Sequence, residues 1–408
     1  FNIYVVKYMN DKPIIIIGAG ISGLALCLTL IKNGYPAVLF EKEKEIDQPG
    51  AGINISPNGN AVLFQLGIKD KILNIADKPT TIELKTYKRG FTISKQNLND
   101  DSERLFGYPY LQMQRKEIIN ILIEEINDID PNIIRTNHSF ENFTENDQAI
   151  LAHFNNQKSF EGSIIVGCDG INSTVKKIML PEAENKFSGI IAWRGLVEME
   201  KLSKKIQDLS STVWMGQNSH FVHYPIKKSK FLNFIGTLKK DKWESSSWHQ
   251  TGDKEELISD YKDWHTTVKE IINNTDKIYK WGLFENKSLP NWVSKRSVII
   301  GDAAHPMSPS YGQGANTALE DAIILYRSIL HFKNDSKSSL KKFQTNRKTR
   351  TQKIQKASKL NTRLFHLNNP ILRVIIYCGM YVLSSLIPLI MIKSKWIYKY
   401  NAFKVKLK

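Results

Sequence analysis

The sequence has few cysteines, and they form neither a disulfide framework nor a metal-binding pattern. Among 408 residues there are three, Cys27, Cys168 and Cys378, which are widely separated and odd in number. Such a set argues against paired disulfides and indicates a reducing compartment, so a cytoplasmic location is predicted. Neither a CxxC nor an HExxH motif occurs, so no metal ligand is predicted.

Signals of export, internal repetition and nucleic-acid binding are also missing. Residues 1–9 have no cationic start followed by a cleavage site, as a secretory signal would. The formal net charge is +17, from 57 Lys and Arg against 40 Asp and Glu, but no zinc-finger or RNA-binding signature accompanies it. The lysines are scattered among asparagines and isoleucines, which indicates a lysine-rich composition rather than a nucleic-acid partner.

Long uncharged runs are absent except near the carboxyl end. Residues 371–392 carry one charge, Arg373, and are long enough to cross a bilayer. Pro388 is expected to divide them into two short helices. Two interpretations stay open. The favoured one is a helix pair packed on the body of the protein, and the other is peripheral membrane contact, for which Lys393 and Trp396 would suit the interface.

A glycine-rich turn near the amino end predicts a dinucleotide site. It follows the apolar run 13–17, which predicts a buried parallel strand, and it leads into a predicted helix. Gly18 permits the tight turn, Gly20 lets the backbone approach a pyrophosphate, and Gly23 lets the helix pack on the strand. The next strand ends in Glu41, where a carboxylate would accept hydrogen bonds from ribose hydroxyls.

The rest of the chain predicts an interrupted α/β organisation. Residues 164–167 and 297–300 read as further buried strands, whereas residues 187–240 alternate as an antiparallel sheet does. Helices are expected over the ranges 58–66, 115–126, 255–272, 314–332 and 339–359. The nucleotide-binding domain therefore begins the chain, is interrupted by a sheet domain, and resumes near residue 297.

Three motifs in order carry a family resemblance. They are the glycine turn, the Cys168-Asp169-Gly170 element, and Gly301-Asp302-Ala303-Ala304-His305-Pro306, which continues into Gly312-Gln313-Gly314-Ala315-Asn316. With these motifs the sequence resembles the single-component FAD-dependent aromatic hydroxylases, which have the p-hydroxybenzoate hydroxylase fold. Within that group it is most similar to the branch of salicylate, 6-hydroxynicotinate and urate hydroxylases. Supporting segments are Gly50-Ala51-Gly52-Ile53, Ala192-Trp193-Arg194-Gly195 and His223-Tyr224-Pro225.

The resemblance implies an α/β fold with a discontinuous Rossmann-like FAD-binding domain, an inserted antiparallel-sheet substrate domain and a helical C-terminal tail. The expected FAD-binding parts are 10–85, 101–180 and 285–345. The substrate domain would take an excursion at 86–100 and its main part at 181–284, and the tail would occupy 346–408.

The resemblance also implies a function. NAD(P)H, bound transiently, would pass a hydride to noncovalent FAD, and O2 would then give a flavin C4a-hydroperoxide that hydroxylates an aromatic or other electron-rich ring. The absence of a second glycine cradle agrees with transient NAD(P)H binding. The expected partner is a small aromatic substrate, and the protein would be a monomer or dimer. The alternative is a membrane-associated flavin oxygenase or epoxidase acting on a lipophilic isoprenoid, quinone or polycyclic antibiotic.

The resemblance assigns cofactor contacts residue by residue. Asp302 would accept from a ribitol hydroxyl, Arg115 would reach the FAD phosphates, and Asp169 would lie where FAD ribose and nicotinamide contacts converge. The helix start after Pro306 would point backbone N–H groups at the flavin. The full predicted set is Gly18, Gly20, Gly23, Glu41, Arg115, Asp169, Asp302, Gly312, Gly314, Ala315 and Asn316.

Four residues are the candidates for catalysis and substrate binding. His220 and Tyr224 share one face of a predicted strand and would orient or deprotonate substrate, or else be satisfied core residues. Arg194 would bind a substrate carboxylate or make a structural ion pair. Pro306 matches the family position close to the reacting edge of the flavin. One departure is Lys176, where many relatives have arginine, and another is Glu285-Asn286, where the branch often has Asp-Arg.

Overall fold

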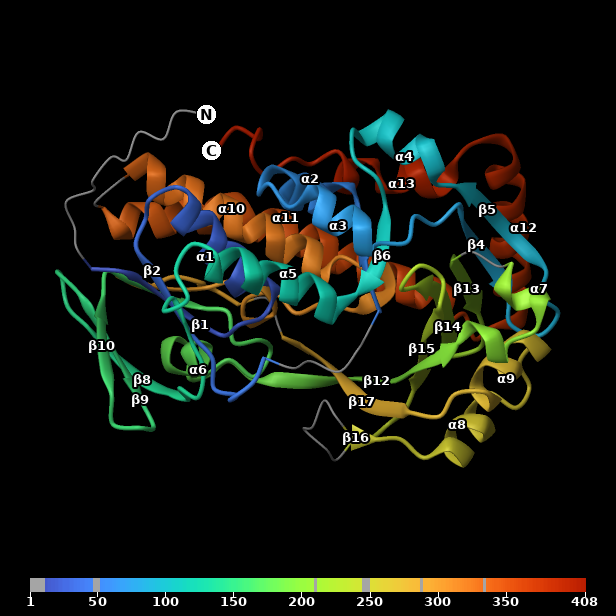
Figure 1. Cartoon of the computed structure of the whole chain (residues 1–408). Helices are drawn as coiled ribbons and strands as arrows, with labels where there is room; N and C mark the ends of the chain where they lie inside the picture. Colours follow the sequence, from blue (N-terminus) through green and yellow to red (C-terminus); the bar gives the residue numbers. More distant parts are fainter. Residues whose placement is uncertain (1–11, 47–51, 209–210, 244–249, 287–288, 333–334) are drawn as a thin grey trace.

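A five-stranded parallel sheet forms the framework of the nucleotide-binding part (Figure 1). The computed structural model describes residues 12–46, 52–208, 211–243, 250–286, 289–332 and 335–408. Neighbouring strands of this sheet are, in order, β18 (Ser297–Ile299), β11 (Ile164–Gly167), β1 (Ile14–Ile17), β2 (Ala37–Phe40) and β7 (Ile134–Arg135). These strands come from three separate parts of the chain, which confirms a discontinuous Rossmann-like domain.

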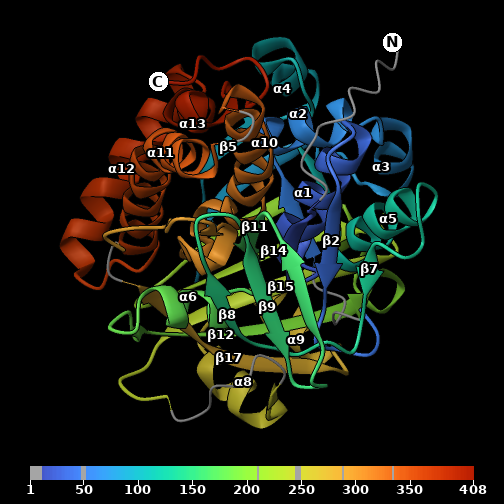
Figure 2. The same ribbon diagram turned by 90° about the vertical axis from the view of Figure 1, so that its left-hand side faces the viewer.

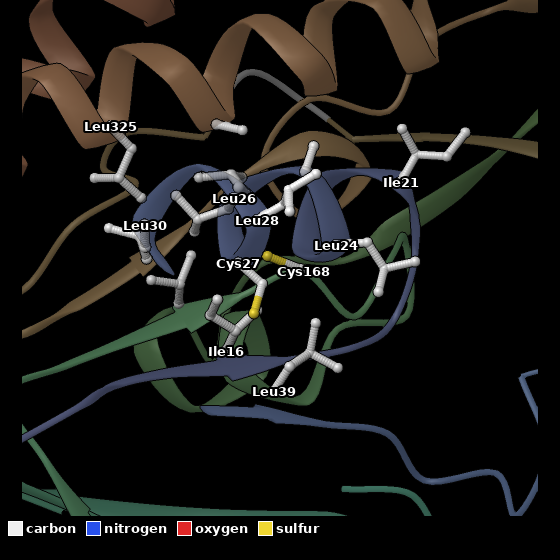
Figure 3. Packing of buried hydrophobic residues seen from close by; sticks show 14 of the residues in the cluster. Ile16, Ile21, Leu24, Leu26, Cys27, Leu28, Leu30, Leu39, Cys168 and Leu325 are labelled. Carbon is white, nitrogen blue, oxygen red and sulfur yellow. The ribbon is translucent and has the colours of Figure 1, made fainter. Parts of the chain in front are cut away.

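Helix α1 (Ile21–Lys32) lies between this sheet and α10 (Gly314–Phe332). Figure 3 shows Cys27 beside Ile16 of the sheet, and Leu325 of α10 on the other side of α1. Almost every residue of α1 is buried, and each buried leucine stabilises the fold by roughly 1.5–3 kcal/mol. Burial raises the pKa of the Cys27 thiol to about 12, so this cysteine is a packing residue.

The second layer is an eight-stranded sheet. Its strands are, in order, β16 (Gln250–Thr251), β17 (Ile278–Asn286), β12 (Asn185–Glu198), β15 (Phe231–Lys239), β14 (Ser219–Ile226), β13 (Ser211–Met215), β4 (Thr81–Thr86) and β5 (Thr92–Asn97). The antiparallel prediction holds for every adjacent pair except β13 with β4, which is parallel. The sheet is therefore mixed, because β4 and β5 enter it from the amino-terminal part of the chain.

One face of this sheet is closed by α8 (Lys254–Asp260) and α9 (Thr266–Asn273), which pack over Trp193, Phe221 and Phe234. The prediction of one helix over 255–272 is wrong. The break occurs because the ring of His265 accepts a hydrogen bond from the Thr267 N–H and caps α9.

The remaining elements connect these layers. Two small antiparallel sheets are β8 (Phe140–Glu145) with β9 (Ile150–Phe154) and β10 (Ser159–Gly162), and β3 (Gly52–Ile55) with β6 (Leu111–Gln114). The other helices of these layers are α2 (Pro57–Gln65), α3 (Lys69–Ile75), α4 (Asn99–Phe106), α5 (Arg115–Asn127), α6 (Thr174–Met179) and α7 (Lys204–Gln207), with short 3-10 turns η1 (Met199–Lys201), η2 (Gly301–Ala303) and η3 (Pro309–Tyr311).

The carboxyl-terminal part is helical, as predicted. It consists of α11 (Ser336–Phe365), α12 (Pro370–Leu386) and α13 (Leu389–Tyr398), with the division near Pro388 as expected. Figure 2 shows α11 beside α10 and α12 at the edge of the molecule. Within the ranges described above, no single helix has the length and hydropathy of a membrane span, although α11 and α12 pass that test together as a pair bent by 114°.

Helix α11 contacts both layers. Gln355 Nε2 donates to the Pro306 carbonyl (2.8 Å), and Ser310 Oγ donates to the Ser358 carbonyl (2.7 Å). At the end of the same helix, His366 lies 2.7 Å from His220 of β14. The longest helix thus joins the loop before α10 to the eight-stranded sheet.

Candidate functional site

The glycine turn between β1 and α1 has the form of a phosphate cradle. Gly18 has φ +103°, and a Cβ there would lie 2.7 Å from the Cys168 carbonyl oxygen. A Cβ on Gly23 would lie 2.1 Å from the Gly18 carbonyl oxygen, so helix and strand pack here only through glycine. A Cβ on Gly20 would meet nothing closer than 4.0 Å. The fold therefore requires Gly18 and Gly23, whereas Gly20 leaves room on the side where a ligand would approach.

Glu41 is held at the end of β2, beside this turn. Its Oε2 accepts from the Ala19 N–H (2.8 Å) and its Oε1 accepts from the Glu43 N–H (3.1 Å). A carboxylate has about four acceptor positions, so Glu41 retains the capacity to accept from ribose hydroxyls.

Asp302 lies where β18 ends, in the turn η2. It is exposed, and its carboxylate is positioned beside Gly314, at the start of α10. Its charge also acts on Arg115, because burial lowers the pKa of Arg115 and Asp302 opposes that change. Asp302 and Arg115 are therefore close enough to interact electrostatically, although 187 positions of the sequence separate them.

A buried ionic network fixes the turn that carries Asp302. Asp321 accepts from the Gly301 N–H (2.9 Å), from His305 Nε2 (2.5 Å) and from Arg347 Nε (2.6 Å). Burial alone would raise the pKa of Asp321, but the charges of His305 and Arg347 lower it to about 2. The adjacent Glu320 binds Arg347 (2.7 Å) as well. We did not predict these residues as part of the site, and Arg347 lies far from every motif.

The loop before α10 is tied to strand β3. Asn316 Nδ2 donates to the carbonyls of Gly312 (2.7 Å) and Asn54 (3.1 Å), and its Oδ1 accepts from the Ser56 N–H (2.9 Å). Gly312 has φ +60°, a conformation that glycine adopts most easily. The first N–H groups of a helix have no partner within the helix, so those of Gly314 and Ala315 are oriented to donate to an anionic or carbonyl oxygen.

Asp169 has a structural role in addition to the predicted one. Its Oδ2 accepts from the N–H groups of Thr174 (2.7 Å) and Val175 (3.2 Å) and thereby caps α6. Its Oδ1 is buried with no hydrogen-bond partner in the described chain, and burial raises its pKa. Lys176, named above as a departure from the family pattern, donates to the Ile171 carbonyl (2.5 Å) and holds the same loop.

The substrate candidates lie on the sheet face opposite α8 and α9. The register pairs Tyr224 with Asn233 and Arg194 with Ile235, so Tyr224 and Arg194 point to one side. Arg194 Nη2 donates to the Gly52 carbonyl of β3 (3.4 Å), and Asn233 Oδ1 accepts from the Gly52 N–H (2.9 Å). The neighbouring residues Gly50 and Ala51 of the family segment lie outside the described residues.

Arg194 interacts electrostatically with Arg115, a candidate cofactor contact, and with Tyr224, a candidate substrate contact. Burial lowers its pKa to about 10, the nearby Tyr224 hydroxyl opposes that change, and the charge of Arg115 adds to it. Its Nε is buried without a hydrogen bond, and no carboxylate of the described ranges lies within ion-pair distance. The structural ion pair considered above is therefore not present among those residues. Electrostatic interactions therefore link Asp302 with Arg115, Arg115 with Arg194, and Arg194 with Tyr224.

His220 shares the face of Tyr224 but is directed elsewhere. Its ring is bound by Thr237 Oγ1 (2.7 Å) and by His366 Nε2 (2.7 Å), and it packs against Phe365. Burial, with the neighbouring His366, keeps the pKa of His220 well below its ordinary value. Pro306 is buried, and its carbonyl accepts from Gln355. The roles of His220 and Pro306 in catalysis stay predictions.

These residues fit FAD. The room beside Gly20 suits a pyrophosphate, Arg115 supplies a cation with an unbonded, buried Nε, and the start of α10 supplies N–H donors. Asp302 and Glu41 supply carboxylate acceptors for the polyol and ribose hydroxyls. No group of three or more metal-ligating side chains occurs in the part of the chain that the structure describes.

Comparison with known proteins agrees with this fit. The family described as "FAD binding domain" matches residues 11–358. The 3-hydroxybenzoate 6-hydroxylase 1 of Aquipseudomonas alcaligenes is 31% identical over 85% of this chain and 87% of its own. The 3-amino-4-hydroxybenzoate 2-monooxygenase PtmB3 of Streptomyces platensis is 28% identical over 88% and 90%. A salicylate hydroxylase in complex with substrate superimposes with a TM-score of 0.81 over 96% of this chain and 97% of its own, at 22% identity.

The matched region includes all three motifs, and the shared fold includes the eight-stranded sheet that carries Arg194 and Tyr224. The cofactor is FAD, and the reaction class is oxygen insertion into an aromatic ring. The chain belongs to the FAD-binding-domain family of FAD-dependent aromatic monooxygenases.

Proposed function

We propose that the enzyme hydroxylates a small aromatic ring that carries both a carboxylate and a hydroxyl group, with NAD(P)H as reductant and O2 as oxidant. The relatives described above are named for 3-hydroxybenzoate, 3-amino-4-hydroxybenzoate and salicylate, and each of these rings has both groups. When bound, FAD supplies the redox chemistry of such reactions. The residues of this chain would select and orient the ring.

Arg194 is the observation on which this proposal rests. A buried guanidinium without a carboxylate partner is costly, and a ligand carboxylate would offset that cost with two charge-assisted hydrogen bonds. Its pKa of about 10 leaves it charged at neutral pH. Its location on the sheet, next to Gly52 of β3, is separate from the glycine turn that suits the pyrophosphate.

Tyr224 is the candidate for the ring hydroxyl. Its side chain is buried, and its hydroxyl makes no hydrogen bond to any residue within the described ranges. Burial raises the pKa of Tyr224, opposed by Arg194, so the phenol remains protonated at neutral pH. A neutral phenol can donate to a substrate phenolate and so favour the electron-rich form of the ring.

A lipophilic isoprenoid or quinone substrate has less support. Arg115 and Arg194 repel one another across the site, and the descriptions of the relatives above name acids. Beside an uncharged ligand, Arg194 would remain a buried cation without a compensating negative charge.

The experiment is a comparison of matched ligands. Holoenzyme is mixed with hydroxybenzoates, hydroxynicotinates and the corresponding phenols or hydroxypyridines without the carboxylate, and NAD(P)H consumption and hydroxylated product are measured. Acids should stimulate at least about ten-fold more strongly, and Arg194→Gln should remove that preference while FAD stays bound. Equal stimulation by acids and decarboxylated rings would refute the proposal.

A further inference from the structure

Helix α12 presents an uncharged apolar face to solvent. Its aliphatic side chains include Ile371, 72% exposed, and Leu386, 75% exposed. Other large hydrophobic residues of the same region with more than a third of their surface exposed are Leu372, Val374, Ile375, Tyr381, Val382, Leu383, Ile387 and Ile392. We call Ile371–Leu386 of this set the α12 patch. Soluble monomers rarely expose contiguous apolar areas of this kind without a partner.

Only a small part of the surface of α12 is covered by the rest of the protein. The helix rests on strand β5 by one narrow stripe, formed by Arg373, Ile376, Tyr377, Met380 and Ser384. These positions recur every three or four residues, so they occupy a single line along the helix. The only charged residue of α12, Arg373, lies in this line and packs over the ring of Tyr87 (5.5 Å). The remaining surface of the helix has no charge.

The charge of the chain is concentrated in this same region. Residues 336–408 contain 17 of the 57 Lys and Arg and none of the 40 Asp and Glu, so residues 1–335 contain 40 of each sign. The excess of +17 therefore belongs entirely to residues 336–408, which form α11 and everything after it. The interpretation of an evenly spread lysine-rich composition is wrong in this respect.

Basic residues lie next to the apolar face. The turn between β4 and β5 carries exposed Lys88 and Arg89 followed by Phe91, which is 54% exposed and contacts the ring of Tyr381 (5.4 Å). On the other side, α13 follows α12 directly and carries exposed Lys395. Figure 1 shows α12 outermost beside β5, with α13 nearby.

We propose that the α12 patch docks the enzyme on a lipid bilayer that contains anionic lipids, with α12 in the plane of the interface. Apolar side chains would enter the acyl boundary while the surrounding lysines and arginines contact anionic headgroups. A second copy of the chain fits poorly on this face, since two tails without a single acidic residue would repel. The docking concerns where the enzyme acts and is independent of the substrate class.

Cys378 allows a direct test. It is the one exposed cysteine of the protein and lies on α12, whereas Cys27 and Cys168 are buried. A polarity-sensitive fluorophore on Cys378 of the FAD-loaded enzyme should shift to shorter wavelength with vesicles of phosphatidylcholine and phosphatidylserine. Pure phosphatidylcholine vesicles should give at least about ten-fold weaker binding, and high salt should release the protein.

Two variants separate the possible results. Ile375→Asp should abolish vesicle co-sedimentation with FAD content unchanged, whereas Ile129→Asp, at a site 48% exposed on another surface, should bind as the parent does. No co-sedimentation of the parent protein with anionic vesicles would overturn the proposal. So would a dimer, measured by light scattering without lipid, that Ile375→Asp converts to monomer, because a second copy would then cover the patch.

Discussion

His305 Nε2 lies 2.5 Å from Asp321 Oδ2, and both side chains are completely buried behind the turn that carries Asp302. The same carboxylate binds the Gly301 N–H and Arg347. The position of Asp302 therefore depends on Asp321, which is fully buried and lines no space that a cofactor could occupy.

The first prediction is that Asp321→Asn lowers both stability and FAD content. Removing one charge from a buried network leaves Arg347 undercompensated, at a cost of about 3–5 kcal/mol. Chemical denaturation of the apoprotein and flavin absorbance of the purified protein give the two readouts. Asp335→Asn, which removes one exposed carboxylate charge at the N-cap of α11, serves as the control and should retain flavin. A fully flavin-loaded Asp321→Asn protein would contradict the role assigned to the network.

The second prediction contrasts two glycines of one turn. Gly20→Ala should fold with unchanged stability, because a Cβ there would meet no protein atom closer than 4.0 Å. It should bind FAD at least about ten-fold more weakly, because the added methyl group would occupy the side from which a pyrophosphate approaches. Gly23→Ala should fail to fold or unfold at much lower denaturant, since its Cβ would overlap the Gly18 carbonyl. Flavin titration of both proteins measures their FAD affinity, and denaturant unfolding curves measure their stability. Equal stability with equal FAD affinity would show that the turn holds no phosphate.

Asp302→Ala should likewise fold and be depleted of flavin.

The third prediction concerns Tyr224. Tyr224→Phe removes a hydroxyl that has no partner in the described chain, so the fold should be unaffected and flavin reduction by NAD(P)H nearly unchanged. Ring hydroxylation should slow about ten-fold or more, because the substrate hydroxyl loses its partner. Stopped-flow measurement of the two half-reactions separates them. Equal slowing of both would assign Tyr224 to cofactor binding instead.

The fourth prediction is a pH dependence caused by the His220–His366 pair. Burial keeps the pKa of His220 well below normal and lowers that of His366 to about 4, whereas both titrate near 6.5 when unfolded. Between these values the unfolded chain binds more protons, so stability should fall as the pH drops from about 6.5 to 4, by up to about 1.4 kcal/mol per pH unit for each histidine. Urea unfolding at pH 7 and 5 measures this. His366→Gln should show a shallower dependence, and an identical slope would exclude the pair as its cause.

Patterns within short stretches of the sequence were sufficient to predict those parts of the site that are formed by neighbouring residues. The strand, turn and helix around Gly18 form within a few residues, and helix α10 begins at Gly314 as predicted. Contacts between residues that lie far apart in the sequence could not be predicted from such patterns. Arg347 reaches Asp321 from another helix, and His366 reaches His220 across 146 residues, with no spacing in the sequence that relates them. The break before α9 was missed because a histidine cap is an unusual helix start.

The distribution of charge along the sequence is more informative than the total net charge. The total of +17 suggested a diffuse property, whereas its confinement to residues 336–408 gives the tail a distinct chemistry. Arg194 and Tyr224 were predicted as substrate-binding candidates, and the register of β12 and β14 with β15, the strand between them, places both side chains on one face.

The contacts of α11 have a mechanical consequence. Helix α11, of 30 residues, is bound through Gln355 and Ser358, in its carboxyl-terminal half, to the turn around Pro306 and Ser310, and the residue that ends it, His366, contacts His220. A relative motion of the eight-stranded sheet and the nucleotide-binding layer would therefore have to change the contacts of α11 at one or both of these points. Ending the chain before His366 would remove the contact with His220 but leave the contacts of Gly52 with Asn233 and Arg194, so α11 would supplement a joint between the layers that β3 already forms.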